Sequence, residues 1–165
     1  MTFYKIEKSF DLVLSDVSNL TQITLLDNHN NILFQQSINK GDSFSKTFNL
    51  ELLPEGDYIV EMENSIRVKR LTFEVRENEV LANNEKSEQI FKPTVTIKVD
   101  VVYVSQFSPE MAPLYVAIYN SKNELIHEET INGKMDLGKK FDFSSTYTGQ
   151  YRFYLESNGM SYDEL

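Results

Sequence analysis

An internal repeat constrains this chain more than any other feature of its sequence. When the sequence is shifted by 93 positions, the spacing from Gly56 to Gly149, residues 23–64 align with residues 116–157 without a gap. The residues of the first copy that recur unchanged are Asn30, Ile38, Asn39, Lys46, Phe48, Gly56, Tyr58 and Glu63. A pattern shared over this length indicates two copies of one small domain instead of one larger core.

Apolar and polar residues alternate along most of each copy. In residues 10–14, 47–52 and 58–63 every second side chain is apolar. A period of two is typical of strands with one buried face, and turn residues separate these short runs. Alanine, the strongest helix former, occurs only at positions 82, 112 and 117. The sequence therefore predicts an all-β fold of two tandem Ig-like antiparallel β-sandwiches.

The segment between the two copies is polar but not uniformly so. We predict a first sandwich over residues 1–82, a linker over residues 83–92 and a second sandwich over residues 93–165. A purely flexible linker would not carry the apolar pairs Val80-Leu81 and Ile90-Phe91. We expect these pairs to dock on the adjoining sandwiches and residues 83–88 to be the mobile part.

Two turn motifs support this fold. Asn158-Gly159 separates two apolar runs, and a type I′ hairpin turn needs two residues that tolerate positive φ. Gly56-Asp57-Tyr58 recurs as Gly149-Gln150-Tyr151, each before an apolar run. This is the sequence position of a tyrosine corner, so we expect Tyr58 and Tyr151 to be buried structural residues whose hydroxyls bond to upstream backbone.

Composition excludes several classes of function. The net charge of -9 argues against nucleic acid as a partner, because phosphate binding needs a basic face. The absence of cysteine excludes disulfides and thiolate metal sites. No stretch approaches the roughly 20 apolar residues of a membrane span. Residues 1–12 lack the basic region and apolar block of a signal peptide, which leaves open whether a leader precedes Thr2.

One part of the first copy carries a family resemblance. Residues 50–62, LELLPEGDYIVEM, followed by VKRLTFEV, resemble the sorting tail of bacterial type IX secretion substrates, whose pattern includes Leu-Pro-x-Gly-x-Tyr. The resemblance covers residues 23–75 and, more loosely, residues 116–165, where Gly149 and Tyr151 keep the pattern. The two-copy layout is similar to small exported proteins of the same bacteria. This resemblance implies an Ig-like sandwich, export to the cell surface or periplasm, and no reaction.

Residues 27–31, DNHNN, are a candidate cation site that we interpret as a turn. Calcium sites need several carboxylates, and only Asp27 supplies one. The equivalent turn of the second copy, residues 120–123, contains Lys122, which would repel a cation. We therefore predict no metal site and no cofactor.

The sequence also argues against catalysis. His29 and His127 are the two histidines and fall in different copies, so they cannot form a catalytic pair with an orienting group. No serine has a nucleophile-elbow setting. Glu128 and Glu129 are neighbours on a strand and point to opposite faces, which disqualifies them as an acid–base pair. We predict that the protein is not an enzyme.

Three tyrosines distinguish the second copy from the first. Tyr115, Tyr119 and Tyr154 replace the first copy's Gln22, Leu26 and Glu61. If the apolar residues between them form the core, period two sends all three tyrosines outward, where they could contact a glycan or a protein partner. Packing between strands or domains is the competing explanation. We expect strands 114–119 and 151–156 in opposite sheets, which makes Tyr115 and Tyr119 the better pair.

The second copy also ends on a shorter strand than the first. Its last strand, MSYDEL, stops three residues before the equivalent of Val75. This edge is either protected by Asp163 and Glu164 or accepts a partner's strand. The sequence as a whole favours a non-enzymatic interaction or structural module of the cell surface or envelope. Carbohydrate binding through the second copy's tyrosines is the alternative, so the expected partner is an envelope protein or a glycan.

Overall fold

The computed structural model describes residues 2–6, 8–146 and 149–164, with the backbone alone for residues 2–6 and 83–86. These residues form strands and turns, and none of them belongs to a helix that could cross a membrane. The backbone divides into two units, Met1–Gln89 and Ile90–Leu165. Each unit is a pair of packed antiparallel sheets, which confirms the predicted all-β fold of tandem β-sandwiches.

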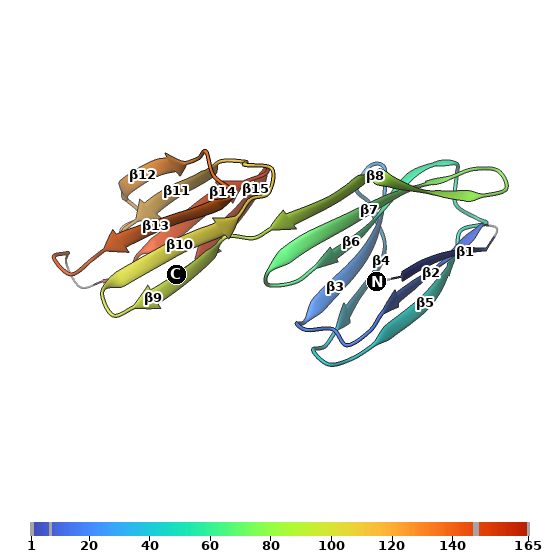
Figure 1. The fold of residues 1–165 in the computed structure, drawn as a ribbon, viewed down its shortest axis with the longest axis horizontal. Helices are drawn as coiled ribbons and strands as arrows, with labels where there is room; N and C mark the ends of the chain where they lie inside the picture. The colour runs from blue at the N-terminus through green and yellow to red at the C-terminus, as the bar shows by residue number, and fades with distance from the viewer. Residues whose placement is uncertain (1, 7, 147–148, 165) are drawn as a thin grey trace. The chain divides into compact units, whose positions relative to one another are not determined.

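Unit 1 is an antiparallel β-sandwich (Figure 1). Its strands are β1 (Thr2–Ile6), β2 (Ser9–Leu14), β3 (Thr21–Asp27), β4 (Ile32–Ile38), β5 (Phe44–Asn49), β6 (Gly56–Glu63), β7 (Arg67–Val75) and β8 (Val80–Phe91). One sheet has the order β1-β2-β5 and the other β4-β3-β6-β7-β8. The core between them is aromatic, with the Phe10 ring 4.9 Å from Phe48 and 5.0 Å from Phe73.

Unit 2 repeats this architecture. Its strands are β9 (Thr94–Lys98), β10 (Val101–Phe107), β11 (Leu114–Tyr119), β12 (Leu125–Ile131), β13 (Asp136–Asp142), β14 (Arg152–Ser157) and β15 (Met160–Glu164). The sheets have the orders β13-β10-β9 and β12-β11-β14-β15. Val116, Ile118, Phe153 and Leu155 lie in the core between them, as the alternation predicted.

The repeat extends to strand register. The β3–β4 ladder begins at Thr21 opposite Ile38, and the β11–β12 ladder begins at Leu114 opposite Ile131, both shifted by 93 residues. The irregularity after Leu25 in the first ladder recurs at the equivalent place in the second. The shared sequence pattern thus specifies the same pairing twice.

The first strands of each sandwich follow a slightly different offset. Phe10 of β2 pairs with Phe48, and Val102 of β10 pairs with Phe141. Because Phe48 and Phe141 are 93 residues apart but Phe10 and Val102 are 92 apart, the second copy has one more residue in the connection that follows this strand. This explains why the ungapped alignment starts only near β3.

The sheet order corrects one sequence-based expectation. The third and sixth strands of unit 2, β11 and β14, are neighbours in one sheet, paired from Tyr115 opposite Glu156 to Tyr119 opposite Arg152. The expectation that they belong to opposite sheets was wrong. Strands three, six and seven also share a sheet in the immunoglobulin order, and here the fourth strand joins them.

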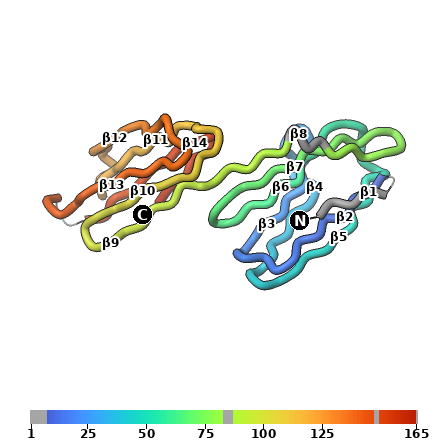
Figure 2. Tube along the Cα trace, viewed as in Figure 1, coloured from blue at the N-terminus to red at the C-terminus, as the bar shows by residue number. Residues whose placement is uncertain are grey.

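Strand β8 occupies most of the segment predicted as a linker. Residues 83–91 of that segment belong to β8, which extends the larger sheet of unit 1 beside β7 (Figure 2). Val80 is fully buried in the core of unit 1, whereas Phe91, at the other end of β8, belongs to unit 2, where its ring lies 5.0 Å from the Phe107 ring. An edge strand needs backbone partners but few apolar side chains, which accounts for the polar composition that indicated a linker.

The predicted hairpin at Asn158-Gly159 is confirmed. The two residues have φ values of 52° and 70° and connect β14 to β15, which pair from Ser157 opposite Met160. Positive φ at both central positions is the requirement of a type I′ turn. This turn sets the register of β15 and therefore which of its residues face the core.

Candidate functional site

The three tyrosines singled out in the sequence lie on one face of one sheet. Tyr115 and Tyr119 are in β11, and Tyr154 of β14 pairs with Ala117, midway between them. Because side chains alternate across a strand, Tyr115, Ala117 and Tyr119 share the face that Tyr154 also occupies. We call this surface, with Arg152 and Glu128, the tyrosine face.

Packing holds the tyrosine rings in defined positions. The Tyr115 and Tyr154 rings meet edge to face, with centroids 6.3 Å apart. The Arg152 guanidinium lies 4.4 Å from the centre of the Tyr119 ring, a cation–π arrangement. Ala117 is completely buried beneath them although it points away from the core. All three tyrosines are half-buried, not fully exposed, because they cover one another and this alanine.

Carboxylates bind the hydroxyls of two of these tyrosines. Tyr115 donates a hydrogen bond of 2.7 Å to Glu128, which raises the pKa of Tyr115 to about 12. Tyr154 donates a hydrogen bond of 3.0 Å to Glu156, which likewise raises the pKa of Tyr154. Both phenols are therefore neutral at physiological pH and fixed in direction. The face combines apolar rings with acceptor oxygens.

The same face of unit 1 is not aromatic. At the positions of Tyr115, Tyr119 and Tyr154 it carries Gln22, Leu26 and Glu61. Glu61 forms an ion pair of 2.7 Å with Arg70 of the adjacent strand. Since both units share one backbone plan, the aromatic face is a property of unit 2 and is not required by the fold.

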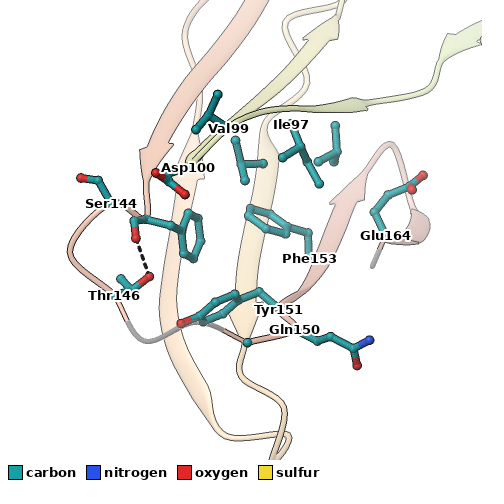
Figure 3. Close-up of a pocket in the computed structure, with 13 residues that line it drawn as sticks. Ile97, Val99, Asp100, Ser144, Thr146, Gln150, Tyr151, Phe153 and Glu164 are labelled. Atoms are coloured by element: carbon teal, nitrogen blue, oxygen red, sulfur yellow. Dashed lines mark hydrogen bonds between the residues drawn. The ribbon is translucent and has the colours of Figure 1, made fainter.

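Unit 2 also contains a pocket of about 560 Å³, lined by both apolar and polar side chains, that the sequence did not reveal (Figure 3). Figure 3 shows the Phe153 ring between Ile97 and Tyr151, with Glu164 to one side. The lining residues come from β9, β10, β14, β15 and the turns beside them, and they are Val95, Ile97, Val99, Asp100, Val102, Phe143, Ser144, Thr146, Gly149, Gln150, Tyr151, Phe153 and Glu164. The pocket opens into the core of the sandwich and is therefore distinct from the tyrosine face.

The turn at Asp27 is built by hydrogen bonds within the chain. One carboxylate oxygen of Asp27 accepts from the backbone N–H groups of His29 and Asn31, and the other accepts from the Asn31 side chain, each at 2.8 Å. These bonds, the Asn31 side-chain bond foremost, lower the pKa of Asp27. Asn120 makes the same two backbone bonds in the second copy. The geometry matches the interpretation of residues 27–31 as a turn.

The remaining polar candidate residues do not lie together at one site. His29 lies in unit 1 and His127 in unit 2. Glu128 faces Tyr115, whereas Glu129 on the opposite face accepts a hydrogen bond of 2.8 Å from Lys139. Burial raises the pKa of Glu129, but Lys139 and His127 outweigh that effect and lower it overall. Among the described residues, no three acidic or histidine side chains gather as a metal site would require.

The two tyrosines assigned to corners differ in burial. The Tyr58 hydroxyl donates a hydrogen bond of 2.9 Å to the carbonyl oxygen of Pro54, and Tyr58 is buried. Burial is the main cause that raises the pKa of Tyr58. Tyr151 is half-buried, its ring 4.7 Å from the Phe143 ring at the pocket.

A family match covers the second half of the chain. Residues 74–163 match the family described as a domain of unknown function, DUF3244. This chain belongs to the DUF3244 family. The DUF3244 match begins in β7 and ends in β15, so it takes in β8 and nearly all of unit 2, including both the tyrosine face and the pocket. It leaves out most of the segment that resembles a secretion sorting tail.

The other comparisons add little to the DUF3244 assignment. No curated protein matches the chain. A solved structure described as the BSP domain of a biofilm-associated protein is similar at 12% sequence identity and a TM-score of 0.31. The similarity covers 93% of this chain and 25% of that chain, so this chain spans about a quarter of its length.

Proposed function

We propose that this protein is a non-enzymatic interaction module of the cell surface or envelope, and that the tyrosine face of unit 2 contacts its partner. The observation that carries the proposal is the convergence of Tyr115, Tyr119 and Tyr154 around the buried Ala117. Tyrosine offers a large contact area and has few rotatable bonds to immobilise, so it is favoured at protein interfaces.

Pre-organisation of the face supports this role. Glu128 fixes the Tyr115 hydroxyl and Glu156 fixes that of Tyr154, so little side-chain freedom remains to be lost on binding. Arg152 donates a hydrogen bond of 2.7 Å to Asp163, which holds its guanidinium in place as a cation beside the Tyr119 ring. Tyrosine and arginine are among the residue types that contribute most to binding energy at protein interfaces. Export of the chain is supported by its resemblance to secreted bacterial proteins.

Carbohydrate binding is the second candidate function, and one observation favours it. Glu128 and Glu156 place carboxylate oxygens beside the Tyr115 and Tyr154 rings. Sugar recognition combines an aromatic ring, which stacks on the apolar face of a sugar, with acceptors for its hydroxyls. The spread of the rings over two strands suits an extended glycan better than a single monosaccharide.

The test replaces the face by its unit 1 counterpart. The triple variant Tyr115→Gln, Tyr119→Leu and Tyr154→Glu carries the residues that the first copy has at these positions. Binding to purified envelope proteins and to a glycan array is then measured for the parent and the variant. Loss of binding with an unchanged circular dichroism spectrum is expected, whereas equal binding by both would refute the proposal.

A matched control tests whether binding depends on the tyrosine face or only on the number of tyrosines in unit 2. Tyr103 is 40% exposed on β10, in the other sheet of unit 2, and Tyr103→Gln removes an equivalent ring elsewhere. The control variant is expected to bind as the parent does. A partner retained on the parent and the control but lost from the triple variant assigns binding to the tyrosine face. The class of that partner, protein or glycan, decides between the two functions.

A further inference from the structure

Cross-strand register decides which charged side chains share the tyrosine face. Residues directly opposite one another on neighbouring strands point to the same side of a sheet. The ladders of β12, β11, β14 and β15 therefore place three carboxylates and one guanidinium on this face. They are Glu128, Glu156, Asp163 and Arg152.

The guanidinium of Arg152 is already engaged within the chain. It donates hydrogen bonds of 2.7 Å to Asp163 and 3.1 Å to the side-chain oxygen of Asn123. The charge of Asp163 is thereby balanced. Glu128 and Glu156 form no ion pair with any residue that the structure describes. Two unbalanced negative charges therefore lie beside the tyrosine rings.

The directions of the hydrogen bonds on this face define what a ligand must supply. Tyr115 and Tyr154 each donate their single O–H to a carboxylate, Glu128 and Glu156 respectively. An ionised carboxylate accepts at up to about four positions and donates at none. The hydrogen-bonding positions that remain open at these two carboxylates are therefore acceptors, which match a ligand rich in donors.

The equivalent surface of unit 1 shows that the fold does not require this excess of carboxylates. Glu128 stands where unit 1 has Gln35, and Asp163 stands where it has Arg70. In unit 1, Arg70 forms an ion pair of 2.7 Å with Glu61. The same backbone plan thus accommodates a neutralised face, and the unbalanced carboxylates belong to unit 2.

Covering the tyrosine rings has an electrostatic cost that a cation can offset. A ligand on the rings also displaces water from Glu128 and Glu156, which lie beside them. Removing water from a carboxylate is unfavourable unless an opposite charge replaces the water. The face of an aromatic ring also attracts ammonium and guanidinium groups. A neutral sugar supplies donors but no compensating charge.

An apolar part adjoins the acidic part of the face. Leu125 pairs with Tyr119 and is 48% exposed. Tyr115 and Tyr119 are four residues apart on one strand, a span of about 13 Å. A small polyamine would satisfy Glu128 and Glu156 but leave the leucine uncovered. A polypeptide segment can present basic and apolar side chains together over this distance.

We propose that the partner of the tyrosine face is a basic polypeptide segment, whose lysine or arginine side chains pair with Glu128 and Glu156 and whose adjoining apolar side chain packs on Tyr119 and Leu125. This inference rests on the proposed function and narrows it to one class of partner. The net charge of -9 also draws positively charged partners toward the protein and disfavours a second copy.

A library of random short peptides displayed on phage tests the class of partner without assuming its sequence. It is selected on the full-length protein and, in parallel, on the variant Tyr115→Gln, Tyr119→Leu and Tyr154→Gln, whose face keeps its charge. Peptides enriched on the parent alone should contain lysine and arginine about twofold or more above their frequency in the starting library.

The other outcomes separate this inference from the proposed function. Neutral or acidic peptides enriched on the parent alone, or a neutral glycan bound in their place, would overturn the inference and leave the proposed function standing. Equal enrichment on the parent and the tyrosine variant would refute both. A selection that enriches no peptide on the parent refutes the inference.

Two charge variants then locate the contact. An enriched peptide is labelled with fluorescein and titrated with each protein by fluorescence polarisation. Glu128→Gln with Glu156→Gln keeps the rings and should weaken binding about tenfold. Glu110→Gln with Asp136→Asn removes the same charge from exposed positions outside the face and should change affinity less than about twofold. Equal weakening in both variants would show general attraction to an acidic protein and overturn the assignment.

Salt dependence provides an independent measurement. The affinity of the parent for the peptide should fall about fivefold or more between about 0.05 and 0.5 M sodium chloride, because salt screens pairs of exposed charges. The variant Glu128→Gln with Glu156→Gln should show a smaller fall. An affinity of the parent that does not change with salt would overturn the proposal, since apolar contacts alone would then account for binding.

Discussion

The hydroxyl of Tyr58 donates a hydrogen bond of 2.9 Å to the carbonyl oxygen of Pro54, four residues upstream, and so fixes the turn that leads into β6. Tyr58→Phe keeps the ring and removes only this bond. We expect the free energy of unfolding of unit 1 to fall by about 1 kcal/mol. Hydrogen exchange of the slowest amides of unit 1 measures it. Tyr103→Phe, on an exposed ring of unit 2, should leave those amides unchanged.

Gly56 and Gly149 occupy equivalent positions in different conformations, which gives a second prediction. Gly56 has φ of 146°, a region that side chains with a Cβ rarely adopt, whereas Gly149 lies outside that region. Gly56→Ala is expected to destabilise unit 1 by about 1–3 kcal/mol through backbone strain. Gly149→Ala should destabilise unit 2 much less, since nothing would contact the added methyl group. Urea unfolding of both variants checks this. Equal losses would contradict it.

Alternation and turn chemistry were sufficient to predict the fold class. The period of two identified Val116, Ile118, Phe153 and Leu155 as core, and Asn158-Gly159 as a hairpin. Both signals are local, because they depend on which face of a strand a residue occupies and on φ at single positions. Strand neighbourhood is not local. Alternation reports the face of β11 and of β14 but not that the two strands are adjacent, and the sequence-based assignment to opposite sheets failed there.

The candidate sites were predictable to a similar degree. Tyr115, Tyr119 and Tyr154 stood out by comparison with the first copy, but Arg152, Glu128 and Ala117, which hold them, were missed. The contacts of these three residues depend on cross-strand register, which cannot be read from local sequence patterns. The pocket had no comparable signal in the sequence, because its lining is brought together from β9, β10, β14, β15 and the turns beside them, which are spread over the whole of unit 2.

Asp27 gives a prediction about acid stability. Its pKa is lowered in the folded protein, chiefly by the Asn31 side-chain hydrogen bond. A carboxyl group with a depressed folded pKa stabilises the fold above its unfolded pKa, about 3.9, and loses that effect as pH falls through the lower folded value. Asp27→Asn should therefore lower the melting temperature of unit 1 at about pH 7, and this difference should shrink as pH falls through the lowered folded pKa of Asp27. A difference in melting temperature between the parent and Asp27→Asn that does not change with pH would contradict a lowered pKa at Asp27.

The same turn gives a prediction about metal ions. Both carboxylate oxygens of Asp27 already accept hydrogen bonds, and Asn120 builds the equivalent turn without a charge. We expect the melting temperature of the protein to be the same in calcium and in EDTA. A ligand that binds the native state must stabilise it by mass action, so a rise with calcium would show that a site exists.

The tyrosine face gives a final prediction, which concerns alkaline pH. The hydrogen bond from Tyr115 to Glu128 raises the pKa of Tyr115 to about 12, so the phenol stays neutral where an unfolded tyrosine ionises. Glu128→Gln removes the carboxylate and should bring that pKa down toward about 10. Titration of the phenolate absorbance should show one more tyrosine ionising between about pH 10 and 12 in the variant than in the parent.

The neighbouring residue supplies the control. Glu129→Gln removes the same charge from the opposite face of β12, where Glu129 pairs with Lys139, and should leave the Tyr115 titration unchanged. Because a raised tyrosine pKa favours the folded state below its unfolded pKa and that contribution is lost as pH rises through the folded value, Glu128→Gln should also weaken the alkaline pH dependence of stability. If Glu128→Gln and Glu129→Gln shift the titration equally, a general loss of negative charge explains the effect. The bond between Tyr115 and Glu128 would then not be what orders the face.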